Sequence, residues 1–301
     1  PALKNYIVNN TKDYIFSSLT ASVDGVMKFA PSPSEGQDGK IGRLYISMDA
    51  TILINDGQHR RRAIEEALKE MPELAHEMIS VVFFQDKGLK RSQQMFADLN
   101  KNAVKPTKSL NILYDQRDNF SQLIVKLVDT IDIFQGRVEL EKTAISNRST
   151  KFFTLNGIAD GTMKLLGISK GRKVSEEEIK IIKEFWTETA RNMSEWQLLI
   201  QGKVSAAELR SGYVNAHTNL LNALGIFGNI LIKEHPNDWK NKIGELKKIN
   251  WSRDNEEWEG RLLQKGRMLK NKLGIELAVN TILKKCGIGL SQERLEFENK
   301  K

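Results

Sequence analysis

Residues 51–62 read Thr51-Ile52-Leu53-Ile54-Asn55-Asp56-Gly57-Gln58-His59-Arg60-Arg61-Arg62, and this stretch decides the fold of the first part of the chain. Its first half is short, apolar and β-branched, which is typical of a buried strand. The Asp-Gly pair then marks a tight turn. The residues that follow, up to Glu70, carry apolar side chains at helical spacing. The stretch therefore predicts a strand that turns directly into the N-terminus of a helix.

The junction between this strand and this helix has the chemistry of an anion site. The N–H groups of a helix's first turn lack partners within the helix, and the helix dipole is positive there. Gly57 permits close backbone approach, and His59 and Arg60 add hydrogen-bond donors. Cations are unfavourable at a helix N-terminus, so three consecutive arginines there favour an anionic ligand.

A purely structural interpretation of the same residues stays open. In it, Asp56 caps the helix, and Arg61 and Arg62 pair with Glu65 and Glu66, four residues further on. The chain also lacks the Gly-x-x-x-x-Gly-Lys-Ser/Thr pattern of a Walker A phosphate loop. The choice between ligand binding and structure therefore depends on evidence beyond this stretch.

The surrounding sequence is mixed in character. Short apolar segments at 43–46 and 79–84 are predicted as further strands, and with the central stretch they indicate a βαβ-like unit over 51–84. Helix-like apolar spacing covers residues 1–10 and 12–20. These patterns predict a small sheet with helices around it.

From about residue 107 onward, the apolar spacing is helical almost throughout. Ser175 and Glu178 form a capping box at the start of one of these helices. The predicted helices cover residues 119–131, 176–200, 213–232, 261–272 and 275–285, the last two separated by Gly274. The expected fold class is therefore α+β, with a first domain over 1–110 and a predominantly α-helical domain over 111–301.

Composition excludes several classes of protein. The chain has 301 residues, of which 40% are hydrophobic and 28% charged, and this argues against wholesale disorder. The single cysteine, Cys286, excludes an internal disulfide framework and a multi-cysteine zinc site, and the four histidines lack metal-ligand spacing. No apolar run approaches the ~20 residues of a membrane span. Since no signal peptide is recognisable either, a cytoplasmic location is expected.

The net charge of +8 favours a polyanionic partner. Two stretches concentrate the excess: residues 137–173 have a net charge of +5, and residues 261–285 have +6. The candidate DNA-binding residues in them are Arg148, Lys151, Arg261, Lys265, Arg267, Lys270 and Lys272. Short donors beside Arg148 and Lys151 suit phosphate contacts. The alternative is a solvated helix face, which accounts for many basic runs.

Asp56-Gly57-Gln58-His59-Arg60 matches the signature of the DGQHR-domain family, and the match extends beyond these five residues. The chain resembles the DndB family, whose members are regulators encoded beside DNA phosphorothioation (sulfur modification) genes in bacteria. The segments that carry this resemblance are Lys12–Phe16, Leu19–Ser22, Arg91–Asn102, Lys105–Pro106 and Phe152–Leu155. It runs from about residue 3 to at least residue 155, and the helical remainder is compatible with it.

The resemblance implies a ParB/sulfiredoxin-like fold for the first domain, in which the Gly turn holds nucleotide phosphates. ATP or another nucleotide, with Mg²⁺, is then the expected ligand, although no particular metal ligand is indicated. The expected nucleotide-binding residues are Asp56, Gly57, Gln58, His59, Arg60, Asn100 and Lys101. A capped helix end before Pro106 explains Asn100 and Lys101 equally well. Family members usually have further sequence before Leu3–Tyr6, so the first domain is expected to be N-terminally truncated.

One departure from the related sulfiredoxins limits the chemistry. Sulfiredoxins have a nucleophilic cysteine where this chain has Gln58. Because the thiol is absent, sulfinic-acid reduction is not expected.

The expected function is that of a DNA-binding transcriptional regulator, a repressor, of a phosphorothioate modification gene cluster, with DNA binding modulated by a nucleotide. The expected partners are double-stranded promoter DNA, a nucleotide, a second copy of the chain and proteins of the modification system, but no membrane. One alternative is a nucleotide hydrolase or DNA-nicking enzyme with Asp56 and His59 as catalytic residues. Another is a scaffold for the modification machinery.

Overall fold

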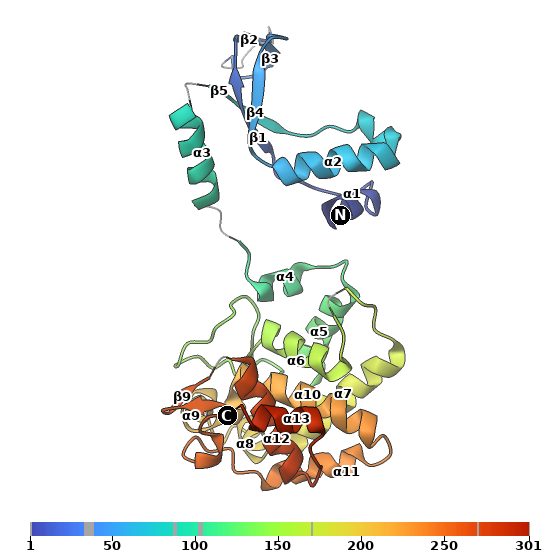
Figure 1. Ribbon diagram of the computed structural model, residues 1–301, viewed down its shortest axis with the longest axis vertical. Helices are drawn as coiled ribbons and strands as arrows, with labels where there is room; N and C mark the ends of the chain where they lie inside the picture. Colours follow the sequence, from blue (N-terminus) through green and yellow to red (C-terminus); the bar gives the residue numbers. More distant parts are fainter. Residues whose placement is uncertain are drawn as a thin grey trace. The chain divides into compact units, whose positions relative to one another are not determined.

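The computed structural model describes residues 2–32, 39–86, 89–101, 105–169, 171–269 and 271–300, and it confirms the α+β class (Figure 1). The chain divides into two compact units, Pro1–Lys105 and Pro106–Lys301, which we call unit 1 and unit 2. Among the described residues, no helix is long and apolar enough to cross a membrane.

Unit 1 is built on a three-stranded sheet in the order β4-β1-β5. The central strand pairs antiparallel with β4, where Ala21 lies opposite Ile54, and parallel with β5, where Leu19 lies opposite Val81. The strands are β1 (Leu19–Asp24), β4 (Thr51–Asp56) and β5 (Val81–Gln85). The first five residues of β1 are all buried, as expected of a central strand.

Two expectations about this sheet are wrong. The helical spacing over 12–20 does not give a helix: residues 11–13 form a turn, 14–18 are irregular, and Leu19 and Thr20 begin β1. The βαβ-like unit over 51–84 does not form either, since β1 lies between β4 and β5, which run in opposite directions. Strand order depends on pairing with a segment far away in the sequence, and local periodicity cannot show it.

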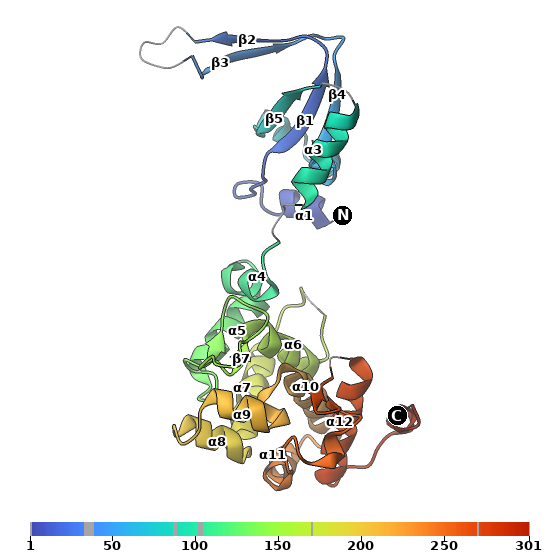
Figure 2. The same ribbon diagram turned by 90° about the vertical axis from the view of Figure 1, so that its left-hand side faces the viewer.

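Helices and a hairpin complete unit 1. They are α1 (Ala2–Val8), β2 (Met27–Pro31), β3 (Gly42–Ile46), α2 (Gln58–Glu70), the 3₁₀ helix η1 (Pro72–His76) and α3 (Leu89–Lys101). α1 packs on α2, where Ile7, Ala63 and Ala67 form a small buried cluster. β2 and β3 form an antiparallel pair that extends away from the main sheet (Figure 2). The predicted strands near residues 43–46 and 79–84 are confirmed as β3 and β5.

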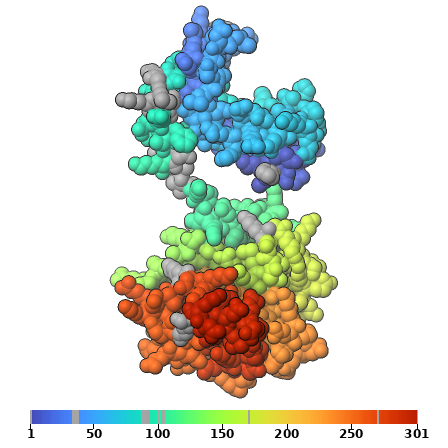
Figure 3. Space-filling view, in the orientation of Figure 1, coloured from blue at the N-terminus to red at the C-terminus, as the bar shows by residue number. Residues whose placement is uncertain are grey.

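Unit 2 is predominantly helical, and its last helix lies on its surface (Figure 3). The helices are α4 (Lys108–Tyr114), α5 (Asn119–Thr130), α6 (Leu155–Leu166), α7 (Glu176–Arg191), α8 (Ser194–Ile200), α9 (Ala206–Gly212), α10 (Thr218–Glu234), α11 (Trp239–Ile243), α12 (Lys272–Lys285) and α13 (Gln292–Glu298). The 3₁₀ helices are η2 (Val214–Ala216), η3 (Gly244–Lys248) and η4 (Glu256–Trp258). Two short strand pairs join β6 (Val138–Glu139) to β7 (Phe153–Thr154), and β8 (Leu263–Gln264) to β9 (Arg267–Met268).

The core of unit 2 surrounds α10, which packs against α6 and α12. Glycine permits the close approach of α6 and α10: a Cβ on Gly225 would stand 2.1 Å from the carbonyl oxygen of Gly161. Trp251 and Trp258 stack in parallel within this core, with ring centroids 5.3 Å apart, and both are fully buried. These tryptophans therefore serve packing.

The observed helices of unit 2 differ in part from the predicted ones. The helix expected over 176–200 is divided after Arg191 into α7 and α8, whereas the capping box of Ser175 and Glu178 at its start is confirmed. α10 begins at Thr218 rather than at residue 213, because the preceding residues form the 3₁₀ helix η2.

The helix expected over 261–272 is wrong. Its residues form the β8–β9 hairpin, whose turn has Lys265 at φ 49° and Gly266 at φ 70°. Two successive residues in the left-handed region are incompatible with a right-handed helix. Asn271 then caps α12 by accepting a 2.7 Å hydrogen bond from the Gly274 N–H, so Gly274 lies inside a helix instead of separating two.

Candidate functional site

The predicted phosphate turn lies at the end of β4, where Gly57 is the N-cap of α2. Gly57 has φ 99°, and a Cβ at this position would stand 2.3 Å from Cδ2 of Leu19. Only glycine satisfies both conditions without strain. No side chain caps the N-terminus of α2, and a helix of 13 residues has a positive dipole at that end. The backbone is therefore arranged as an anion site requires.

Arg60 is bound to the protein around it. Its Nη2 donates to Oδ2 of Asp56 at 2.5 Å, and its Nη1 donates to the Ser17 carbonyl at 2.8 Å and to the Ser17 hydroxyl. A weaker bond of 3.4 Å reaches the Ser18 carbonyl. Only 15% of the Arg60 side chain is exposed. Arg60 thus joins the start of α2 to the segment that leads into β1.

The remaining residues of the turn are exposed. Gln58 donates from Nε2 to the Ile54 carbonyl at 3.1 Å, and His59 points to the surface. Arg61 and Arg62 form ion pairs with Glu65 and Glu66 at 2.6 and 3.2 Å. The structural interpretation of Arg61 and Arg62 is therefore confirmed. Exposed i,i+4 pairs of this kind stabilise a helix by only about 0.3–0.5 kcal/mol each.

Two cavities border α2 and divide the predicted residues between them. One, of about 320 Å³, is lined by Arg60 together with Tyr14, Phe16, Ser17 and Ser80, among others. The other, of about 400 Å³, is lined by Gln58, Arg61, Arg62 and Glu65 next to three residues of β4. Gln58 and Arg60 therefore face different cavities. The first one combines an arginine and serine hydroxyls with aromatic walls, a lining that small-molecule sites share.

The predicted nucleotide-binding residues Asn100 and Lys101 lie in a segment that is only partly described. Lys101 is the last residue of α3 and is exposed, and it does not belong to the described residues that line either cavity. The side chain of Asn100 and residues 102–104 lie outside the described part of the chain. In the described residues, no three His, Cys, Asp or Glu side chains are grouped as a metal site.

Ser17 is a site residue that the sequence interpretation missed. It lies in an irregular segment 43 residues before Arg60 and has no periodicity or motif of its own. The shared segment Lys12–Phe16, which ends directly before it, was the only available signal.

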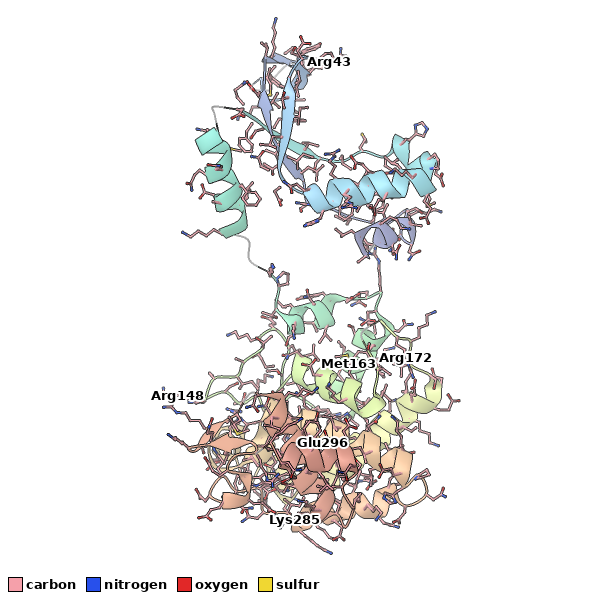
Figure 4. All side chains as sticks on the ribbon, viewed as in Figure 1. Arg43, Arg148, Met163, Arg172, Lys285 and Glu296 are labelled. Atoms are coloured by element: carbon pink, nitrogen blue, oxygen red, sulfur yellow. The ribbon has the colours of Figure 1, made fainter. Side chains whose placement is uncertain are left out.

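The predicted DNA-binding residues of unit 2 fall into exposed and inward-facing groups. Arg148 stands on the surface of the loop between β6 and β7, as Figure 4 shows, and Lys151 follows it with its Nζ 3.0 Å from the Gly136 carbonyl. Lys265 and Arg267 are exposed on the β8–β9 hairpin, and Lys272 is exposed at the start of α12. Lys270 lies outside the described residues.

Arg261 faces the protein. Its guanidinium pairs with Glu298 through two bonds of 2.9 Å and donates to the Leu277 carbonyl at 3.0 Å, and 13% of the side chain is exposed. It attaches α13 to α12 and has little surface left for DNA.

Arg210, which the sequence interpretation did not single out, organises the loop that carries Arg148. It is buried on α9 and donates to the carbonyls of Asn147 at 3.1 Å, Ser149 at 2.6 Å and Lys151. The loop over 146–151 thereby gains a fixed scaffold, because a guanidinium offers five donors in one plane.

Arg253 connects this loop to the hairpin. It donates from Nη1 to the Arg210 carbonyl at 3.3 Å and from Nη2 to the Gly266 carbonyl at 2.6 Å. The two basic stretches that are far apart in the sequence are therefore linked through Arg210 and Arg253. Arg148 in Figure 4 and β9 in Figure 1 accordingly lie at the same edge of unit 2.

Comparison with known proteins extends over both units. A family model for DndB, described as DNA-sulfur modification-associated, matches residues 1–289. No curated protein and no solved structure matches, so the ParB/sulfiredoxin-like fold stays a prediction. The family match covers nearly the whole chain and agrees with the residues that carry the resemblance in the sequence. The chain belongs to the DndB family of DNA-sulfur modification-associated proteins.

Proposed function

We propose that the protein is a DNA-binding regulator, specifically a transcriptional repressor, of a DNA phosphorothioate modification gene cluster. Its family supports the connection with DNA sulfur modification. The observation that carries the DNA-binding part is the link through Arg210 and Arg253, which joins the loop of Arg148 to the hairpin of Arg267. We call Arg148, Lys151, Lys265 and Arg267 the basic rim of unit 2.

The basic rim has the properties of a phosphate-binding surface. Its members are exposed or half-buried cations on backbone that hydrogen bonds from Arg210 and Arg253 hold in place. Preorganised cations lose less conformational entropy on binding than cations on free loops. Contacts to phosphate release counterions, so the affinity for DNA must fall steeply as salt increases.

Fluorescence anisotropy with a short promoter duplex at several salt concentrations tests this proposal. We expect Arg148→Ala combined with Arg267→Ala to weaken binding about tenfold or more and to reduce the salt slope by about two. Lys180→Ala combined with Lys183→Ala on α7 removes the same charge outside the basic rim and is the matched control. Wild-type protein without salt-dependent DNA binding, or equal losses in the two double variants, would contradict the proposal.

The second part of the proposal is modulation by a nucleotide, ATP or another, bound at the N-terminus of α2. The uncapped first turn at Gly57, Gln58 and His59 and the cavity beside Arg60 support it. Mg²⁺ would accompany the phosphates, since it prefers phosphate and water oxygens. Asp56 is the carboxylate of the turn, and its ion pair with Arg60 would have to be shared or exchanged on binding.

Gln58→Glu tests the nucleotide site at the cost of one exposed hydrogen bond, from Gln58 Nε2 to the Ile54 carbonyl. A carboxylate in the first turn interacts favourably with the helix dipole but repels a phosphate at the same place. We expect calorimetry to show nucleotide affinity reduced about tenfold, whereas Gln93→Glu on α3 leaves it unchanged. Equal nucleotide affinity in both variants would exclude a phosphate at this turn.

The scaffold alternative has a specific observation in its favour. Leu53 of β4 and Val82 and Phe84 of β5 are 39–50% exposed, and the strand register places them on one face of the sheet of unit 1. Exposed apolar groups of this kind mark protein interfaces. Stable association with a second copy or with proteins of the modification system, in the absence of any DNA binding, would favour this alternative.

A further inference from the structure

Unit 2 contains a cavity of about 620 Å³ next to the basic rim. Asn147, which precedes Arg148, and Met268, which follows Arg267, are among the residues that line it. We call this cavity the rim pocket. Its other walls come from Arg210 on α9, from the start of α10 and from Arg253. The rim pocket therefore lies between the β6–β7 loop and the β8–β9 hairpin, the two segments that carry the basic rim.

The described residues that line the rim pocket carry positive charge only. Arg210 and Arg253 both line it, and none of its described lining residues is an Asp or a Glu. The first residues of α10, Thr218 and Asn219, also line it. α10 has 17 residues and no side-chain cap at its N-terminus, so its positive dipole end opens here.

Arg210 provides an independent sign of a missing partner. The residue is 9% exposed, and its Nε is buried without a hydrogen-bond partner among the described residues. A buried unpaired donor costs about 1–3 kcal/mol, and more for a charged group. An anion in the rim pocket would offset the positive charge of this buried guanidinium.

His217, the N-cap residue of α10, adds neither charge nor a free donor to the rim pocket. Its Nε2–H donates to the Arg210 carbonyl at 3.1 Å. Burial, with help from the charges of Arg253 and Arg210, lowers the pKa of His217 to about 4. The positive charge of the rim pocket therefore comes from the two guanidinium groups and the helix end.

We propose that the rim pocket binds one phosphate group of the DNA backbone. The inference rests on the proposed DNA binding and names its central contact. A backbone phosphate suits the site better than a free nucleotide, because the exposed cations of the basic rim flank the pocket and can meet neighbouring phosphates of the same strand. Phosphate contacts of this kind fix the register of a protein on DNA.

Ala207→Glu tests the pocket without removing an existing contact. Ala207 lines the rim pocket in the first turn of α9, where an acidic side chain is favourable. We expect the affinity for the promoter duplex to fall about tenfold and the salt slope to decrease by about one. Ser194→Glu adds the same charge to the first turn of α8, away from the pocket lining, and is the matched control.

The outcomes separate this inference from the proposed function. If the Arg148/Arg267 double variant loses affinity while Ala207→Glu behaves like Ser194→Glu, DNA binding stands and the pocket inference is overturned. If the wild-type protein shows no salt-dependent binding, both fail. Inorganic phosphate is the remaining probe. Phosphate could raise the melting temperature of the wild-type protein but not that of Ala207→Glu, while Ala207→Glu leaves the DNA affinity unchanged. This result would assign the pocket to a free anion and overturn the inference.

Discussion

Arg60 and Asp56 form an ion pair of 2.5 Å one helical turn apart, across the junction of β4 and α2. The same guanidinium holds the Ser17 carbonyl, so one side chain joins three segments of unit 1. We expect Arg60→Ala to lower the free energy of unfolding of unit 1 by about 1 kcal/mol, because its bonds to the exposed Ser17 carbonyl and to the half-exposed Asp56 are lost together. Hydrogen exchange of the amides in β1 and β4 of the full chain measures this change.

Arg61→Ala is the matched control for Arg60→Ala. Its pair with Glu65 is exposed, with 60% and 48% of the two side chains accessible, so its loss should cost no more than about 0.5 kcal/mol. If the amides of β1 and β4 exchange faster than in the wild type by the same factor in both variants, Arg60 does not join these segments.

Gly57→Ala should destabilise unit 1 through two separate effects. The φ of 99° is unfavourable for any L side chain, and the new Cβ would meet Leu19 Cδ2 at 2.3 Å. We expect a loss of at least about 2 kcal/mol, seen by hydrogen exchange in β1. Gly202 has φ 70°, and nothing lies within 4 Å of a Cβ at this position. Gly202→Ala therefore reports the backbone effect alone, a loss of about 1 kcal/mol in the free energy of unfolding. Losses of the same size would contradict the contact with Leu19.

The β4–α2 junction was predictable because every signal for it is local. A β-branched run, an Asp-Gly turn and a helical stripe follow one another within 20 residues, from Thr51 to Glu70. The partner of Arg60 at Ser17 was not predictable, since the contact spans 43 residues and involves a main-chain carbonyl that any residue supplies. For the same reason, the insertion of β1 between β4 and β5 was missed.

In the basic stretches, the sequence could not show which side chains are exposed, because this again depends on contacts with distant segments. Arg261 and Arg267 are six residues apart and look alike in the sequence, yet one pairs with Glu298 and the other is exposed. The difference comes from α13, which returns to the hairpin 37 residues later. Charge counting therefore identifies basic segments but cannot assign individual side chains to solvent or to the core.

Glu298 should make the attachment of α13 dependent on pH. The hydrogen bonds from Arg261, followed by the bond from Asn280, lower the pKa of Glu298 to about 2 despite some burial. A carboxyl with a lowered pKa in the folded state contributes stability above its ordinary pKa of 4.5, and this contribution is lost as the pH falls from 4.5 towards 2. We expect hydrogen exchange in α13 to accelerate over that range, with a loss of at most about 3 kcal/mol.

Glu298→Gln should remove this pH dependence and release α13 already at pH 7. Glu296→Gln, an exposed position on the same helix that Figure 4 labels, is the matched control and should retain it. An unchanged exchange profile in Glu298→Gln would mean that the pair with Arg261 does not hold the helix.

His217 should resist protonation until strongly acidic pH. Burial is the main cause of its pKa of about 4, and the charges of Arg253 and Arg210 lower the value further. Because the folded pKa lies below the ordinary 6.5, the neutral side chain contributes stability above pH 6.5, and this contribution is lost as the pH falls from 6.5 towards 4. We expect the free energy of unfolding to decrease over this range by at most about 3 kcal/mol.

NMR titration of the His217 ring protons measures the pKa directly, and His217→Gln should flatten the stability profile between pH 4 and 6.5. The same replacement at His76, an exposed residue of unit 1, is the matched control. A midpoint near 6.5 for His217 would show that the ring is solvated and that the arginines beside it are already neutralised. A phosphate in the rim pocket should raise the midpoint, because the anion offsets the charges of Arg210 and Arg253 that now oppose a third positive group.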